Sequence, residues 1–344
     1  MTLMWKEIME QPAVLKNCFD VNYDTVIKIA DTVKSQNIRY GVIAARGTSD
    51  HAGIYGKYMM ETYAGIPVGL AAPSVTSMYG ADINFSSGMV IGISQSGEAK
   101  DVLSVLKAAN KKGAVTVGIT NYLDSPIAKE ANFHLWCNAG PEKSVAATKT
   151  FTAQMMILGM LAGALSESNA VFDELKKVPD LIKTTLDDHE KINGFVNRYT
   201  YAQEFFILAR GFNYAIALES GLKIQETTYI RAKAYAVSDF YHGPFAMLTP
   251  QIPVIMYATE GPLLGDANNM LDKLADKNLE VIVVSNDQDS LNKGTESFKI
   301  PKCHVSVAPF LCAAFAQMFA CKLSLSKRLN PDKPRDLNKV TITV

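Results

Sequence analysis

Three short runs of the chain combine hydroxyl groups with small residues and are candidates for holding a ligand: Gly47–Ser49, Ser94–Gly97 and Val145–Thr148. The second is the most informative, because it ends the apolar, β-prone stretch Gly88–Ser94 and precedes a helical pattern. Such a strand–helix junction offers unpaired backbone N–H groups, a partial positive charge and hydroxyl donors to an anion. The run lacks the lysine of a nucleotide-binding P-loop, so it suits one small phosphate. The alternative is that one of its two serines only caps the helix.

Glu226 and His242 are the candidates for moving a proton. Glu226 lies three residues after Lys223 in an amphipathic pattern, and this spacing is also typical of an ion pair on a solvated helix surface. His242 precedes a Gly-Pro turn, where a histidine serves either the structure or proton transfer near neutral pH. Lys339, in the C-terminal tail, is either a solvated charge or the partner of a phosphate or carbonyl group.

The elements that must position these residues alternate between strands and helices, which indicates parallel α/β sheets. An N-terminal helical stretch, 4–36, is expected to break at Pro12, and residues 169–200 read as helical. In the first half, strands are expected at 39–45, 67–71, 88–94, 114–120 and 133–137, and helices at 50–63, 98–112 and 148–166.

The second half of the chain repeats the first. Val42–Gly47 is echoed by Phe206–Gly211, and Val115–Asn121 by Val281–Asn286. The repeat predicts two similar α/β domains in tandem. In the second copy, residues 258–262 replace the serine-rich run, so we expect only the first copy to bind phosphate. Ligands of open parallel sheets bind beyond the carboxyl ends of the strands, so the first two serine-containing runs are expected to face one crevice.

Composition excludes several classes of partner and site. The 344 residues carry 34 basic and 34 acidic side chains, which argues against a nucleic-acid partner. The five cysteines and five histidines show no disulfide or metal-ligand spacing, so we expect no metal, no cofactor and a cytoplasmic location. The apolar stretch Phe151–Leu165 is too short to cross a bilayer and is expected to be a buried helix, with no membrane contact.

Several motifs together resemble those of the tandem sugar-isomerase (SIS) domain family. The similarity extends from Lys6 to Lys339, and it is greatest to the isomerase half of glucosamine-fructose-6-phosphate aminotransferases and to stand-alone glucosamine-6-phosphate deaminases. The motifs are Arg46–Ser49, Ser94–Glu98, Val145–Lys149, Ala217–Lys223, His242–Pro244 and Pro334-Arg335.

The resemblance implies two tandem SIS domains, each a parallel-sheet α/β/α sandwich of the flavodoxin-like kind. The expected divisions are N-terminal helices in 1–36, a first SIS domain with the phosphosugar cradle in 37–168, a helical connector in 169–200, a second SIS domain in 201–330, and a tail in 331–344 that completes the site.

The resemblance also implies roles for individual residues. Ser49, Ser94, Gln95 and Ser96 would bind the phosphate of a small sugar phosphate, and Thr48 and the Val145 backbone would contact sugar hydroxyls. Glu226 would move the proton between C1 and C2. His242 would assist ring opening from a neighbouring subunit, which implies a homodimer with shared active sites. Lys223 and Lys339 would surround C1 and C2, and the lysine matching Lys339 is linked in the family with ring opening and an imine.

Two residues depart from the family pattern. Ala99 replaces a threonine that often contacts phosphate, and Ala147 replaces a serine that often contacts the sugar. The first change removes about one hydrogen bond, roughly 0.5–1.5 kcal/mol, and the second leaves the identity of the sugar open.

The expected activity is that of an amino sugar phosphate isomerase and deaminase. The sequence starts at Met1-Thr2 directly before the first helix, so we expect no glutaminase domain and no synthesis from glutamine. The expected reaction converts glucosamine 6-phosphate, or a close relative, to fructose 6-phosphate and ammonia. The alternatives are a fructosamine-6-phosphate deglycase and, in another class, a non-catalytic module that senses sugar phosphates.

Overall fold

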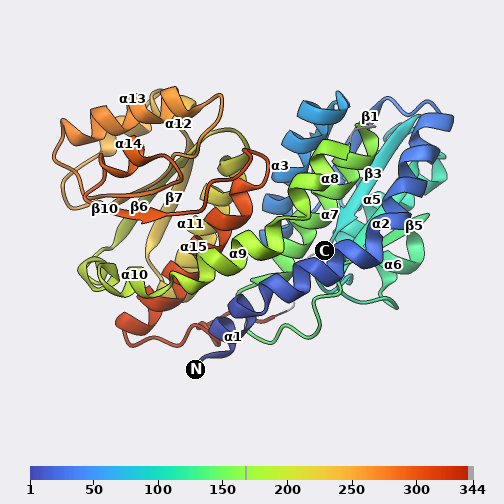
Figure 1. Cartoon of the computed structure of the whole chain (residues 1–344). Coiled ribbons are helices and arrows are strands. Elements are labelled where there is room, and N and C mark those ends of the chain that lie inside the picture. Colours follow the sequence, from blue (N-terminus) through green and yellow to red (C-terminus); the bar gives the residue numbers. More distant parts are fainter. Residues whose placement is uncertain (167–168, 340–344) are drawn as a thin grey trace. The chain divides into compact units, whose positions relative to one another are not determined.

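The computed structural model describes residues 1–166 and 169–339, which divide into two compact units (Figure 1). The N-sheet unit comprises Ala13–Glu142, Lys149–Lys177 and the described end of the tail from Asn338. The C-sheet unit comprises Met1–Pro12, Lys143–Thr148 and Val178–Leu337. The last residues of the tail that was expected to complete the site, 340–344, lie outside the described residues.

Five parallel strands form the sheet of the N-sheet unit, in the order β2-β1-β3-β4-β5. Their bounds are β1 Tyr40–Ala44, β2 Val68–Leu70, β3 Gly88–Ile93, β4 Val115–Thr120 and β5 Phe133–Trp136. β3 and β4 are buried along their whole length, which is characteristic of central strands in a parallel sheet covered on both faces. The strands expected in this half are therefore confirmed.

Helices cover both faces of this sheet. They are α2 Gln11–Ser35, α3 Thr48–Met59, α4 Pro73–Ser77, α5 Lys100–Lys111, α6 Pro126–Glu130, α7 Lys149–Leu165 and α8 Asn169–Leu175, with a π-helical turn at Met60–Ala64. On one face, Val90 clusters with Leu106 of α5 and Ile127 of α6. On the other, α3 approaches so closely that a Cβ at Gly53 would lie 2.9 Å from Ile43 of β1. The unit is thus a three-layer α/β/α sandwich.

The C-sheet unit has the same strand order. Its parallel sheet runs β7-β6-β8-β9-β10, so counted within the unit both sheets read 2-1-3-4-5, the flavodoxin-like order. The bounds are β6 Glu204–Ala209, β7 Arg231–Ala236, β8 Val254–Tyr257, β9 Val281–Ser285 and β10 Glu296–Lys299. The predicted tandem repeat is confirmed.

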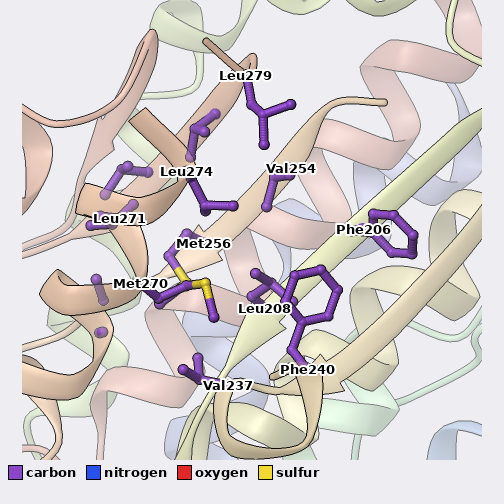
Figure 2. Close-up of a cluster of buried hydrophobic side chains, with 14 of the residues drawn as sticks. Phe206, Leu208, Val237, Phe240, Val254, Met256, Met270, Leu271, Leu274 and Leu279 are labelled. Atoms are coloured by element: carbon purple, nitrogen blue, oxygen red, sulfur yellow. The ribbon is translucent and has the colours of Figure 1, made fainter. Parts of the chain in front are cut away.

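The second sheet is also covered on both faces. The helices of the unit are α1 Leu3–Met9, α9 Val178–Asp187, α10 Glu190–Asn193, α11 Tyr214–Thr228, α12 Val237–Phe240, α13 Leu264–Ala275, α14 Gln288–Leu291 and α15 Ala308–Ser326. Figure 2 shows Met270 and Leu274 of α13 in one buried cluster with Leu208 and Met256 of the sheet. On the opposite face, the ring centroid of Phe315 in α15 lies 5.0 Å from that of Phe298 in β10.

Two helices are apolar throughout. α7 is buried along nearly its whole length, as expected for the stretch Phe151–Leu165. Of the described helices, only α15 has the length and hydropathy that a membrane span requires, and 89% of the relevant window is buried inside the protein. Its rings pack against the second sheet, so α15 has the surroundings of a core helix.

The N-terminal helical stretch breaks two residues earlier than predicted. α1 ends at Met9, Glu10 forms the junction, and α2 starts at Gln11. Pro12 therefore stands in the first turn of α2, where its missing N–H leaves no helical hydrogen bond unmade.

A carboxylate from the far end of the chain completes the start of α1. Thr2 caps the helix by accepting the N–H of Trp5 at 3.1 Å. The carboxylate of Asp332 accepts the N–H groups of Leu3 and Met4, each at 2.8 Å, although 329 residues separate Leu3 from Asp332. The first-turn N–H groups that a helix leaves unpaired are satisfied by these contacts.

Candidate active site

The loop after β3 has the form that an anion cradle requires. Ser94 Oγ accepts the N–H of Gly97 at 3.1 Å, and Ser96 Oγ accepts the N–H of Glu98 at 3.3 Å. α5 begins at Lys100, and its N-cap residue, Ala99, makes no side-chain capping bond. The two serines therefore shape the loop and do not cap the helix, so the capping alternative is wrong.

Gly97 is required by the geometry of this turn. Its φ angle is +69°, and a Cβ at this position would lie 2.1 Å from Oγ of Ser125. Ser125 is itself the N-cap of α6 and accepts the N–H of Ala128. The serine loop is thus fixed against the start of a neighbouring helix, and only glycine satisfies both the backbone angle and the space.

The loop after β1 joins the same site. Its glycine, Gly47, is the N-cap of α3 with a φ angle of +54°, and Ser49 in the first turn is buried. Arg46 Nε donates to Oδ2 of Asp101 in α5 at 2.7 Å, and Asp101 is 1% exposed. Since β1 and β3 are adjacent parallel strands, this ion pair ties the two loops together at one sheet edge. The structure therefore brings Thr48, Ser49, Ser94, Gln95 and Ser96 to neighbouring strand ends, as predicted.

The corresponding loop of the second copy is built differently. The N–H of Glu260 donates to Oδ1 of Asn286 at 2.8 Å, and the Glu260 carboxylate pairs with Lys302 at 2.8 Å. A carboxylate stands where the first copy has serines, and its negative charge disfavours a phosphate. The predicted loss of the cradle in the second copy agrees with this geometry.

Lys223 lies between two carboxylates on α11, in the C-sheet unit. Its Nζ is 2.5 Å from Oε2 of Glu226 and 3.4 Å from Oε1 of Glu219. Lys223 and Glu219 are fully buried, whereas the Glu226 side chain is 21% exposed. Burial acts to lower the pKa of Lys223, but the charges of Glu219 and Glu226 outweigh it and raise the pKa above its usual value. The pair is therefore not a solvated surface pair.

Glu219 was not assigned a role by the sequence reasoning. The sequence pattern that could have identified Glu219 is its i, i+4 spacing to Lys223, which places both side chains on one helix face. Oε2 of Glu226 is thus held in position by a lysine that Glu219 also contacts.

Lys339 also has a buried acidic partner, in the N-sheet unit. Its Nζ is 2.8 Å from Oε2 of Glu142, and the Glu142 side chain is 0% exposed. Glu142 in turn accepts the N–H of Thr150 at 3.2 Å and its hydroxyl at 2.8 Å, at the start of α7. A carboxylate is favoured at a helix N-terminus. Lys339 is thus held in an ion pair, which argues against a solvated charge, and Glu142 was missed because only the fold brings the two together.

Val145 and His242 lie in the C-sheet unit with Glu226. The Val145 loop is held by the buried carboxylate of Glu7 in α1, which accepts the N–H of Lys143 at 2.5 Å and that of Ser144 at 3.2 Å. The N–H of Val145 donates to the Asp332 carbonyl at 3.3 Å. His242 is exposed in the turn after α12. The predicted residues therefore fall into two sets. The residues assigned to the phosphate lie with Lys339 in the N-sheet unit, and those assigned to proton transfer lie in the C-sheet unit.

No metal centre is evident in the part of the chain that the structure describes. No cluster of three or more His, Cys, Asp or Glu side chains in residues 1–166 and 169–339 has the geometry to hold an ion. All five cysteines are unbridged thiols, and burial raises the pKa of Cys321 to about 11.

The chain is similar to known proteins along almost its whole length. It is 37% identical to a glutamine–fructose-6-phosphate aminotransferase (isomerizing) of Aquifex aeolicus over 345 residues, covering 99% of this chain and 57% of that protein. The chain thus spans little more than half the length of such relatives.

Two solved structures share the fold. One is the C-terminal domain of a glucosamine-fructose-6-phosphate aminotransferase from Francisella tularensis, with a TM-score of 0.89 and 24% identity over 97% of this chain and 98% of that one. The other is a glucosamine-6-phosphate deaminase from Thermotoga maritima, with a TM-score of 0.81 and 20% identity over 99% and 100%. The SIS domain model matches residues 38–164 and 199–326. Because these two stretches make up most of the chain and each contains one of the sheets, the chain belongs to the SIS-domain family and contains two copies of the domain.

Proposed function

We propose that the chain is an aldose–ketose isomerase of an amino sugar phosphate that releases ammonia. Glucosamine 6-phosphate and water would give fructose 6-phosphate and ammonia. The observation that carries the proposal is the partly exposed Glu226 carboxylate, held by a buried lysine whose charge Glu219 shares. The relationship to isomerizing aminotransferases supports the substrate class.

The cradle residues are suited to the phosphate. Ser94 Oγ and Ser96 Oγ each accept a backbone N–H, and a hydroxyl that accepts one hydrogen bond keeps its proton to donate. We assign these two hydroxyls, with Ser49 and Gln95, to the phosphate oxygens and Thr48 to a sugar hydroxyl. Because the phosphate is remote from the reacting carbons, its binding energy serves to position the sugar.

Glu226 is assigned to the proton transfer. In the open-chain amino sugar it would take the proton from C2 and return it to C1. The amine gives up a second proton and the C1 oxygen takes one up, so that the C1 aldehyde becomes a hydroxymethyl group and the C2 amine becomes an imine. Water then adds to the imine carbon, and ammonia leaves as the ketone forms. The nearby ammonium of Lys223 would stabilise the negative charge that develops on the oxygen at C1.

His242 and Lys339 are assigned to the steps around ring opening. The exposed position of His242 suits a side chain that acts outside its own protomer. Lys339 is held beside Glu142, so it is available as an oriented cation. Val145 would contact a sugar hydroxyl through its backbone. The unbridged cysteines agree with the reducing cytoplasm that we propose as the location.

The substrate assignment is tested by measuring ammonia release from glucosamine 6-phosphate and glucosamine, and release of the attached amine from a fructosamine 6-phosphate. We expect turnover of glucosamine 6-phosphate, very little of glucosamine, and a raised KM in Ser96→Ala, since one phosphate hydrogen bond is lost. Equal turnover of glucosamine with and without phosphate would contradict the cradle. Turnover of the fructosamine 6-phosphate alone would indicate a deglycase, and binding without turnover a sensor.

We also propose that the active protein is a homodimer in which His242 completes the partner's site. Mixing Glu226→Gln subunits with His242→Ala subunits leaves one intact site in each hybrid dimer. Activity should return to about a quarter of that of the unaltered protein after random exchange of subunits. Each variant alone, carried through the same exchange, is the control. A mixture as inactive as its components would rule out the shared site.

A further inference from the structure

A cavity in the C-sheet unit lies outside every residue assigned to the proposed reaction. It opens where α1 and α10 pack against α15, and its volume is about 560 Å³. Ligand pockets have volumes of roughly 300–1,000 Å³. The lining includes Trp5, His189, Asn193, Val196, Lys322 and Leu325.

Lys322 brings an unbalanced positive charge to this cavity. Its Nζ donates to Oδ1 of Asn193 at 2.5 Å and lies 4.7 Å from the ring centroid of Trp5. Within 1–166 and 169–339, no carboxylate lies at salt-bridge distance from it. Burial lowers the pKa of Lys322, although the charge of Glu190 acts in the opposite direction. A half-buried ammonium without an acidic partner is costly, and an anion that enters the cavity would compensate it.

The other residues that line the cavity favour an anion that carries a planar, apolar ring. The ring of His189 meets Trp5 edge-on, with centroids 5.3 Å apart and an interplanar angle of 88°. Nδ1 of His189 is 3.1 Å from Oε1 of the exposed Glu190 but makes no hydrogen bond in the described part of the chain. Aromatic side chains that line a cavity pack well against planar groups of a ligand. The carboxylate of Glu190 at the rim disfavours a second negative charge.

We propose that this cavity binds a small planar organic monoanion, such as an aromatic carboxylate or sulfonate. The anionic group would pair with Lys322, and the ring would lie against Trp5 and the aliphatic side chains of Val196 and Leu325. The proposal does not rest on the proposed reaction, since none of these residues belongs to it.

The test uses Trp5 as a reporter. The chain has two tryptophans, Trp5 and Trp136, so Trp136→Phe leaves Trp5 as the sole emitter at the cost of one hydrogen bond to Asn121. The probe is 8-anilinonaphthalene-1-sulfonate, a monoanion with a planar naphthalene ring that absorbs at the wavelengths of tryptophan emission. We expect saturable quenching of Trp5 with energy transfer to the probe. Saturable binding that leaves Trp5 emission unchanged would place the probe elsewhere and overturn the proposal, as would no binding.

The variant Lys322→Gln tests whether the positive charge of Lys322 contributes to binding of the anion. We expect the affinity for the sulfonate to fall by about tenfold or more, the effect of losing one charge-assisted hydrogen bond. The affinity for the uncharged analogue N-phenyl-1-naphthylamine should not change, and Lys111→Gln, at an exposed lysine of α5, should bind both probes normally. Equal affinity of Lys322→Gln for the sulfonate would overturn the proposal. If Trp136→Phe is unstable, calorimetric titration of the unaltered chain and of Lys322→Gln makes the same comparison.

Discussion

Replacing Glu226 with glutamine is expected to lower kcat for ammonia release by about 10²–10⁴-fold, the usual contribution of a general base. KM should change little. The amide is nearly isosteric and its oxygen still accepts from Lys223, so the position of the side chain is preserved, but an amide does not take up and return a proton. The measurements are steady-state ammonia release and, by NMR in D₂O, exchange of the hydrogens at C1 and C2.

Glu219→Gln is the matched control for this variant. Glu219 contacts the same lysine from the same helix but, unlike Glu226, has no exposed part, so we assign it no proton transfer. We expect exchange at C1 and C2 to persist in Glu219→Gln and to disappear in Glu226→Gln. Exchange that continues unchanged in Glu226→Gln would eliminate this residue as the base and leave His242 as the next candidate.

Replacing Lys223 with methionine is expected to lower the free energy of unfolding by about 3–5 kcal/mol, because Glu219 is left as a buried charge without its partner. Urea denaturation measures the loss. The double variant Lys223→Met/Glu219→Gln should recover part of it, since the remaining buried group is neutral. As a control, Lys177→Met breaks an exposed pair with Glu174 and should cost no more than about 0.5 kcal/mol. A loss equally small in Lys223→Met would contradict the buried arrangement.

The buried ion pairs of Lys223 also determine how the free energy of unfolding depends on pH. The pKa of Lys223 is raised in the folded protein. Its contribution to stability is therefore fully present below the unfolded pKa of about 10.4 and is lost only as the pH rises toward the higher folded pKa. The stability difference between the unaltered protein and Lys223→Met should stay constant from neutral pH to pH 9 and shrink only in strong alkali.

The parallel strands and the two serine loops could be inferred from the sequence, because both depend on local patterns. The flavodoxin-like arrangement of the strands was implied only by the family resemblance. Apolar strands ending in Gly47–Ser49 and Ser94–Gly97 mark strand ends that a parallel sheet must bring together. The division of the chain at residues 36, 168, 200 and 330, and the roles of the site residues, stay predictions.

The acidic partners could not be inferred, because distant parts of the chain supply them. Asp101 is separated from Arg46 by 55 residues, and Glu142 from Lys339 by 197. Glu219 lies nearby in sequence, but the burial of Lys223 depends on the other elements that pack around α11. From the sequence alone, charged residues are expected to be exposed to solvent, and only the fold shows which of them are buried.

The contact between α1 and Asp332 has a consequence for the order of events during protein synthesis. At about 5–20 residues per second, Asp332 is made roughly 15–65 s after Leu3, whereas helices form within about a microsecond. For that interval α1 lacks the carboxylate that satisfies its first turn, and Met4 and Ile8, which are fully buried in the finished protein, have no completed unit to cover them. α1 is thus made more than 300 residues before the carboxylate that secures it, and until then its apolar side is open to chaperones.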